Sequence, residues 1–256
     1  MSGISQFGKL KKPTNKFINM KKFFFILLSV LSLQTFGQKI INDPNAKLRS
    51  ISSDFTAVSL ATGIELFLTQ ANNVSLAVSA NDEKYESFIK TEVDNGVLHI
   101  YYENKNSTNR WEKGRKIKAY LSAKTISKLT GSSGARIELV NVFSVSKLNL
   151  RMSSGSQFEG EVKVTDLSVD QSSGSEIKVS GVASNLEVDA SSGAAFKGYG
   201  LSTDNCTASA STGADIKITI NKELNASASS GGNIVYKGNA ATKDVTKSSG
   251  GSVRRG

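Results

Sequence analysis

A Ser/Thr-Gly element that recurs about every 19 residues dominates the second half of the chain. It occurs seven times, from Ser132-Ser133-Gly134 to Ser248-Ser249-Gly250, and the steps between its glycines are 21, 19, 19, 20, 18 and 19 residues. A period this regular is the signature of a repeat architecture, in which each unit packs only against its neighbours.

Two positions around the glycine are apolar in every copy. The column five residues before the glycine is Leu129, Leu150, Val169, Val188, Ala208, Ala226 and Val245, and the column three residues after it is Ile137, Phe158, Ile177, Phe196, Ile216, Ile234 and Val253. Between these columns apolar and polar residues alternate over short runs, which is the period of a β-strand. We expect both columns to point into a core.

One such unit cannot bury its apolar face alone, whereas stacked units pair each strand in parallel with the same strand of the next unit. The sequence therefore predicts an all-β fold, a slim parallel β-helix (solenoid) with Ser-Ser-Gly corners. Glycine suits a sharp corner because it adopts positive φ, and serine hydroxyls can bond to backbone groups at a turn. We interpret the corners as structural; the alternative is a serine ladder that binds a glycan or an ice-like lattice.

The first half is also β-rich but lacks the Ser-Ser-Gly sequence. Residues 55–70 read as two strands around Thr62-Gly63, residues 74–80 and 116–122 as single strands, and 88–102 as a hairpin through Asp94-Asn95-Gly96. We expect either less regular entry coils or a small antiparallel cap that covers the open end of the solenoid.

The N-terminus has the pattern of a secretory signal peptide. An apolar run from Phe23 to Leu33 follows Lys21-Lys22 and precedes Gly37, and it is too short to span a bilayer. We predict a signal peptide with an N-terminal extension at 1–37 (with Met20 as an alternative start) and a linker at 38–49. The β-rich part (50–125) and the repetitive β-helix (126–256) follow as one domain, exported to the periplasm or the cell surface.

The charge of the chain does not indicate a nucleic-acid partner. The formal net charge is +10, but residues 1–37 contain six lysines and no acid, which leaves +4 on residues 38–256. This is an ordinary surface charge and not the footprint of a nucleic-acid binder.

The usual catalytic residues are scarce. The chain has one cysteine, so no intrachain disulfide can form, and Cys206 occupies a column that holds leucine in other units, which predicts a buried, inert thiol. His99 is the single histidine, and we interpret it as a half-buried strand residue. Without a phosphate, dinucleotide or zinc motif, the sequence predicts no enzyme, no cofactor and no metal.

Four residues are candidate ligand contacts. Trp111 lies in a polar loop with Tyr101 as a neighbouring aromatic residue, and an exposed loop tryptophan can anchor a partner. Asp170 and Asp189 are expected to stack in successive coils as a weak acidic patch. Clustered acids are what a polysaccharide-cleaving site needs.

These features together carry a family resemblance. Residues 55–70 read FTAVSLATGIELFLTQ, residues 97–100 read VLHI, and coils of the form Leu-x-Val-x-x-Ser-Ser-Gly-x-x-Ile follow. Over about residues 48–253 the chain resembles the "putative auto-transporter adhesin, head GIN domain" family, a Bacteroidetes-type domain of unknown function. The resemblance implies a right-handed β-helix exported to the envelope and an adhesin-like role, and it supplies no catalytic residues.

Three hypotheses follow. The first is a non-enzymatic envelope protein, not integral to the membrane, that binds a surface glycan or protein. The second is a carbohydrate-active enzyme or glycan-binding protein on a β-helix, and the third is a structural periplasmic protein that associates with copies of itself.

Overall fold

The computed structural model describes residues 43–51, 53–103 and 114–256. The predicted signal peptide and Trp111 lie outside these residues. No helix among the described residues has the length and apolar character that a membrane crossing requires.

The described part contains β-strands and one short 3₁₀ helix. The strands of the N-terminal half are β1 (Lys47–Arg49), β2 (Ala57–Leu60), β3 (Glu65–Gln70), β4 (Ser75–Ala80), β5 (Ile89–Asp94), β6 (Val97–Tyr102), β7 (Ile117–Ala123), β8 (Lys128–Gly131) and β9 (Arg136–Leu139), with the 3₁₀ helix η1 at Glu83–Phe88. Those of the C-terminal half are β10 (Phe143–Met152), β11 (Gln157–Gln171), β12 (Glu176–Ala190), β13 (Ala195–Ala210), β14 (Asp215–Ala228), β15 (Asn233–Lys237), β16 (Ala241–Lys247) and β17 (Ser252–Arg255).

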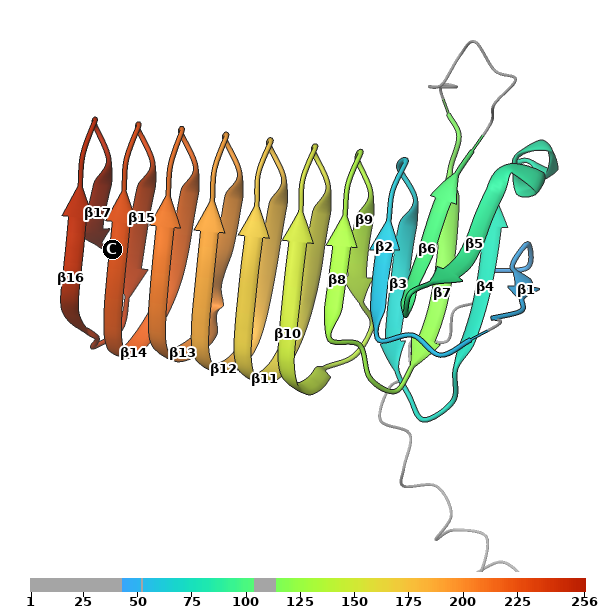
Figure 1. Cartoon of the computed structure of the whole chain (residues 1–256), viewed down its shortest axis with the longest axis horizontal. Helices are drawn as coiled ribbons and strands as arrows, with labels where there is room; N and C mark the ends of the chain where they lie inside the picture. Colours follow the sequence, from blue (N-terminus) through green and yellow to red (C-terminus); the bar gives the residue numbers. More distant parts are fainter. Residues whose placement is uncertain (1–42, 52, 104–113) are drawn as a thin grey trace, which may run out of the picture. The chain divides into compact units, whose positions relative to one another are not determined.

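The C-terminal half is a parallel β-solenoid, as the repeat predicts (Figure 1). Strands β11 to β14 each leave one corner, bend, and run into the next corner, so that one strand supplies parts of two coils. β11 pairs in parallel with β12, from Gln157 opposite Glu176 to Gln171 opposite Ala190. The offset between partners equals the sequence period, because each residue pairs with its equivalent one coil further along.

The two apolar columns form the core. The column after the glycine is buried throughout, from Ile137 at 0% exposure to Val253 at 8%. The column before the glycine is buried from Leu129 to Ala226, but Val245 is 40% exposed. The prediction that every member points into a covered core is therefore wrong for Val245. The reason is that β16 pairs with β14 on one side, and no further coil of the described chain covers its other side.

Each corner is a tight turn of type I′. In the first Ser-Ser-Gly copy Ser133 has φ 52° and Gly134 φ 74°, and the N–H of Ala135 donates to the carbonyl of Ser132 at 3.1 Å. Positive φ at both central residues together with this hydrogen bond defines the type I′ turn. The glycine N–H then donates to the neighbouring coil, as Gly134 does to the carbonyl of Ser154 at 3.0 Å, so the corners form a ladder of their own.

The N-terminal half contains a coil with the same corner but a different sequence. β2 and β3 meet at Thr62-Gly63, where φ is 60° and 71°. The N–H of Gly63 donates to the carbonyl of Ser133 at 3.0 Å and thereby joins the corner ladder. This coil stacks out of sequence order, because β2 pairs with both β6 and β8, and β3 with both β7 and β9.

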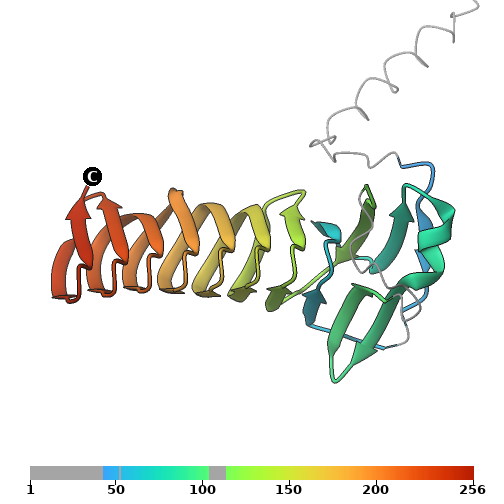
Figure 2. The ribbon, with the colours of Figure 1, turned by 90° about the horizontal axis from the view of Figure 1, so that it is seen from above.

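Antiparallel strands cover the N-terminal end of the stack (Figure 2). β4 pairs antiparallel with β7 and with β1, and β5 pairs antiparallel with β6 through the predicted hairpin, where Asn95 and Gly96 have φ 48° and 75°. Entry coils and an antiparallel cap are therefore both present. Asp43 joins the segment before β1 to this cap, because its carboxylate accepts hydrogen bonds from the hydroxyl groups of Ser79 at 2.6 Å and Tyr120 at 2.7 Å.

Candidate functional site

The repeat coils have two faces. The first face consists of the segments that enter the corners, at 147–152, 166–171, 185–190, 205–210 and 223–228. The second face consists of the segments that leave them, at 157–160, 176–179, 195–198, 215–218 and 233–236. Outward side chains of one face stack in columns, because the parallel register places equivalent residues opposite one another.

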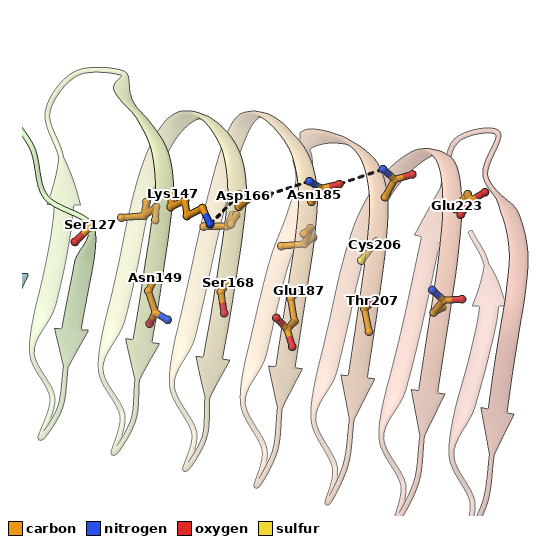
Figure 3. Close-up of a pocket in the computed structure, with 15 residues that line it drawn as sticks. Ser127, Lys147, Asn149, Asp166, Ser168, Asn185, Glu187, Cys206, Thr207 and Glu223 are labelled. Atoms are coloured by element: carbon orange, nitrogen blue, oxygen red, sulfur yellow. Dashed lines mark hydrogen bonds and ion pairs between the residues drawn. The ribbon is translucent and has the colours of Figure 1, made fainter.

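A groove of about 770 Å³ runs across the first face, where that face begins after the bend (Figure 3). Two columns of polar side chains line it, and we call it the ladder groove. The outer column is Lys147, Asp166, Asn185, Asn205 and Glu223, and the inner column is Asn149, Ser168, Glu187, Thr207 and Asn225.

The outer column is a chain of contacts from one coil to the next. Lys147 lies 3.8 Å from the Asp166 carboxylate. The Asn185 amide donates to Asp166 at 2.9 Å, and the Asn205 amide donates to Asn185 at 3.1 Å. A primary amide has two N–H donors and an acceptor oxygen. These asparagines are therefore fixed in position and keep further donors and acceptors for a ligand.

The inner column is largely without partners. The side-chain oxygen of Asn149 is shielded from solvent and accepts no hydrogen bond. In the part of the chain that the structure describes, the side chains of Ser168, Glu187 and Thr207 make no hydrogen bond or ion pair within the protein. Buried polar groups are normally hydrogen-bonded, so unpaired polar groups in the wall of a groove indicate positions where a ligand can supply the hydrogen bond.

The two predicted acids stack as the sequence suggests but do not line the groove. Asp170 lies opposite Asp189 in the β11–β12 register. Asp170 also forms an ion pair with Arg151 at 3.3 Å. Arg151, Asp170 and Asp189 occupy equivalent positions on consecutive coils and form an outward column next to the groove. Asp189 lies two residues beyond Glu187 on the same strand face, so the acids flank the groove on the corner side.

Tyr101 lies elsewhere. It belongs to β6 in the cap region and donates a hydrogen bond to Glu92 at 2.9 Å. This bond to a carboxylate raises the pKa of the Tyr101 phenol. Tyr101 lies in β6, whereas Asp170 and Asp189 lie in β11 and β12, and none of the three lines the ladder groove.

Cys206 is buried and His99 is a partly buried strand residue, as predicted. Cys206 is 3% exposed between the two columns of the groove, and burial raises the pKa of its thiol to about 12. A thiol that stays protonated is a poor nucleophile. His99 is a partly buried residue of β6, opposite Ser59 and Glu92.

The sequence contains a signal for the groove, which is a polar column further from the corner than the two apolar columns. Every member of the outer column stands eight residues before a corner glycine and is polar. Asn185 and Asn205, which carry the hydrogen-bonded ladder, occupy this position in successive coils. Because their chemistry differs from that of Lys147 or Glu223, the shared feature is outward direction and not one residue type.

A family model described as "Putative auto-transporter adhesin, head GIN domain" matches residues 54–240. The chain belongs to this family. No curated protein matches it. The family match agrees with the resemblance carried by the opening strands and the Ser-Ser-Gly coils.

Solved structures show the same fold at low sequence identity. The crystal structure of "a putative adhesin" from Bacteroides fragilis is 16% identical, with a TM-score of 0.73 over 83% of this chain and 98% of that chain. "A putative adhesin" from Parabacteroides merdae is 16% identical, with a TM-score of 0.62 over 84% and 97%. A "putative lipid binding protein" from Parabacteroides distasonis is 17% identical, with a TM-score of 0.57 over 84% and 98%. These likenesses establish the architecture.

Proposed function

We propose that this chain is a non-enzymatic, exported envelope protein that binds an extended surface glycan along the ladder groove. The adhesin-like family gives the general class of function. The observation that carries the specific proposal is the inner column, where Ser168, Glu187 and Thr207 present polar side chains on consecutive coils without protein partners.

An extended polymer fits this arrangement because the coils repeat every 4.7–4.9 Å or so along the stack. Amide, hydroxyl and carboxylate groups at this spacing can bond successive hydroxyls of a sugar chain. The outer column holds Asn185 and Asn205 in fixed orientations before the ligand arrives. Such preorganisation reduces the entropic cost of binding.

The binding test uses purified protein and envelope polysaccharides from the producing bacterium. We expect an Asn185→Ala/Glu187→Ala double variant to bind at least about tenfold more weakly, since each hydrogen bond contributes about 0.5–1.5 kcal/mol and those to charged groups more. The matched control is Asn233→Ala, which removes an asparagine of a comparable ladder on the second face, where it donates to Asp215 at 2.6 Å. Equal affinity of the double variant and the wild type would rule out the groove as the site.

The same polysaccharides test for catalysis. We expect no new reducing ends and no unsaturated products on prolonged incubation. Turnover that is lost in Asp170→Ala or Asp189→Ala would instead establish the carbohydrate-active alternative, in which the stacked acids act on the glycan.

Protease accessibility in intact cells tests the location. Digestion of the native protein without membrane disruption would place the solenoid outside the cell, where it can bind a surface polymer. Digestion only after disruption of the outer membrane would place it in the periplasm and favour a role in maintaining the envelope.

Association between copies is a second candidate function, favoured by the last coil. All residues of β16 are exposed, and Val245 is 40% exposed in a column that is otherwise buried. A coil that leaves apolar surface uncovered can stack on another solenoid. Sedimentation equilibrium tests this: concentration-dependent dimers that Val245→Lys abolishes would support association, and a monomer at high concentration would exclude it.

A further inference from the structure

The second face carries an irregular coil. The register between β12 and β13 shifts between Lys178 and Ser180, and that between β13 and β14 shifts between Gly198 and Ser202. These shifts make a β-bulge around Tyr199, which stands between Gly198 and Gly200. Bulges of this kind redirect a side chain, and here Tyr199 is 37% exposed.

Beside the bulge, three lysines stand in register on consecutive coils. Lys178 lies opposite Lys197 in the β12–β13 register, and Lys197 lies opposite Lys217 in the β13–β14 register. Each lysine forms an exposed ion pair with an acid. Glu159 lies 2.6 Å from Lys178, Glu176 lies 2.7 Å from Lys197, and Asp215 lies 3.3 Å from Lys217. Exposed ion pairs contribute little free energy, so a bound anion can replace or share these partners.

Further cations give this region an excess of positive charge. The Lys237 ammonium lies 4.4 Å from the centre of the Tyr199 ring. Arg254 continues the lysine column, opposite Val235, and Arg255 follows it. Among the described residues no carboxylate forms an ion pair with Lys237, Arg254 or Arg255.

These groups surround a depression of about 580 Å³ whose charged and aromatic lining consists of Lys178, Lys197, Lys217, Tyr199 and one acid, Glu159, which pairs with Lys178. We call it the Tyr199 site. The three lysines span about 10 Å along the stack. An aromatic ring beside a short row of ammonium groups matches a sugar ring that carries acidic groups.

We propose that the Tyr199 site binds an acidic glycan, with its carboxylate or sulfate groups on the lysine column and one sugar ring against Tyr199. This site lies on the face opposite the ladder groove and is independent of the function proposed for that groove. Among the described residues around this site, the cations without an acidic partner are Lys237, Arg254 and Arg255, which are too few for the broad basic surface that nucleic-acid binding uses. One partly exposed tyrosine also offers little apolar surface for insertion into a membrane.

The experiment compares two forms of one ligand. The full chain is titrated calorimetrically with oligogalacturonate and with its fully methyl-esterified form, which has the same rings without charge. We expect binding of the acid form that weakens as salt increases, because the site is exposed and screened, and no measurable binding of the ester. A Lys178→Gln/Lys197→Gln/Lys217→Gln variant should bind at least about tenfold more weakly. A Tyr199→Ser variant should bind about fivefold more weakly.

Lys124→Gln, at an exposed position after β7 and outside both proposed sites, is the matched control and should bind like the wild type. Circular dichroism midpoints within about 2 °C of the wild type establish that the variants are folded. The proposal is overturned if the ester binds as tightly as the acid or if the triple variant retains full affinity. It is also overturned if an oligonucleotide or an anionic phospholipid vesicle binds more tightly than the acidic glycan. Loss of binding in the groove variant Asn185→Ala, with the lysine variants unaffected, would assign the acidic glycan to the groove instead.

Discussion

The threonines at two of the corners allow a prediction of different outcomes from the same substitution. Thr62 and Thr212 each stand directly before a corner glycine, with φ 60° and 50°. A left-handed conformation costs a residue with a Cβ about 1–2 kcal/mol, and a β-branched one is a clear outlier. Asparagine tolerates this conformation and is a preferred residue at this turn position.

The two threonines differ in what their hydroxyls do. The Thr62 hydroxyl donates to the carbonyl of Ala61 and accepts from the N–H of Tyr102, both at 2.7 Å. In the described structure the Thr212 hydroxyl makes no hydrogen bond within the protein. Thr212→Asn should therefore raise the free energy of unfolding by about 1 kcal/mol. In Thr62→Asn the lost bond to Tyr102, about 0.5–1.5 kcal/mol, should offset that gain.

Thermal unfolding followed by circular dichroism measures the difference. A gain of 1 kcal/mol corresponds to an increase of about 2–4 °C in the midpoint for a chain of this size. We expect this increase for Thr212→Asn and a change near zero for Thr62→Asn. The reasoning is refuted if Thr212→Asn lowers the midpoint, or if the two variants shift it equally.

Three further predictions concern the core and the cap. Phe196→Ala, at a position with 0% exposure, should lower the free energy of unfolding by about 3–5 kcal/mol in urea titrations; a loss below about 1 kcal/mol would contradict the inward column. Because burial raises the pKa of Cys206 to about 12, a thiol reagent at neutral pH should label it only in denaturant, and rapid labelling of folded protein would show that the thiol is accessible. Hydrogen bonds from Ser79 and Tyr120 lower the pKa of Asp43, so its stabilising effect is complete above the unfolded pKa of about 3.9 and is lost as the pH falls through the lower folded value. The difference in melting midpoint between wild type and Asp43→Asn should accordingly shrink below about pH 4, and a constant difference would contradict this assignment.

The repeat was sufficient to predict the C-terminal solenoid, because its columns specify direction as well as period. The apolar residues on both sides of Gly193, Val188 and Phe196, are buried as the alternation requires. The same columns occur around Gly63, where Val58 stands five residues before the glycine and Leu66 three residues after it, both at 0% exposure. This coil does not stand out in the sequence, because its corner is Thr62-Gly63 instead of Ser-Ser-Gly and the next corner glycine, Gly134, is far away along the chain.

The stacking order of the N-terminal half could not be predicted from local patterns. The coil of β2 and β3 lies between two coils that follow it in sequence, and this order depends on long-range pairing that no short motif encodes. The ladder groove escaped sequence reasoning for a related reason. Asn185 and Asn205 become neighbours only through the parallel register, and Lys147 or Glu223 at equivalent positions gives no common chemical pattern.

The side-chain amides of the asparagines offer the most direct test of the proposed groove. Two-dimensional ¹H–¹⁵N spectra of the protein, titrated with a bacterial envelope polysaccharide, report on Asn185, Asn205 and Asn233 separately. We predict that the amide signals of Asn185 and Asn205 shift with added polysaccharide while those of Asn233, on the second face, do not. Saturable binding that shifts Asn233 and leaves the two groove asparagines unchanged would contradict the account.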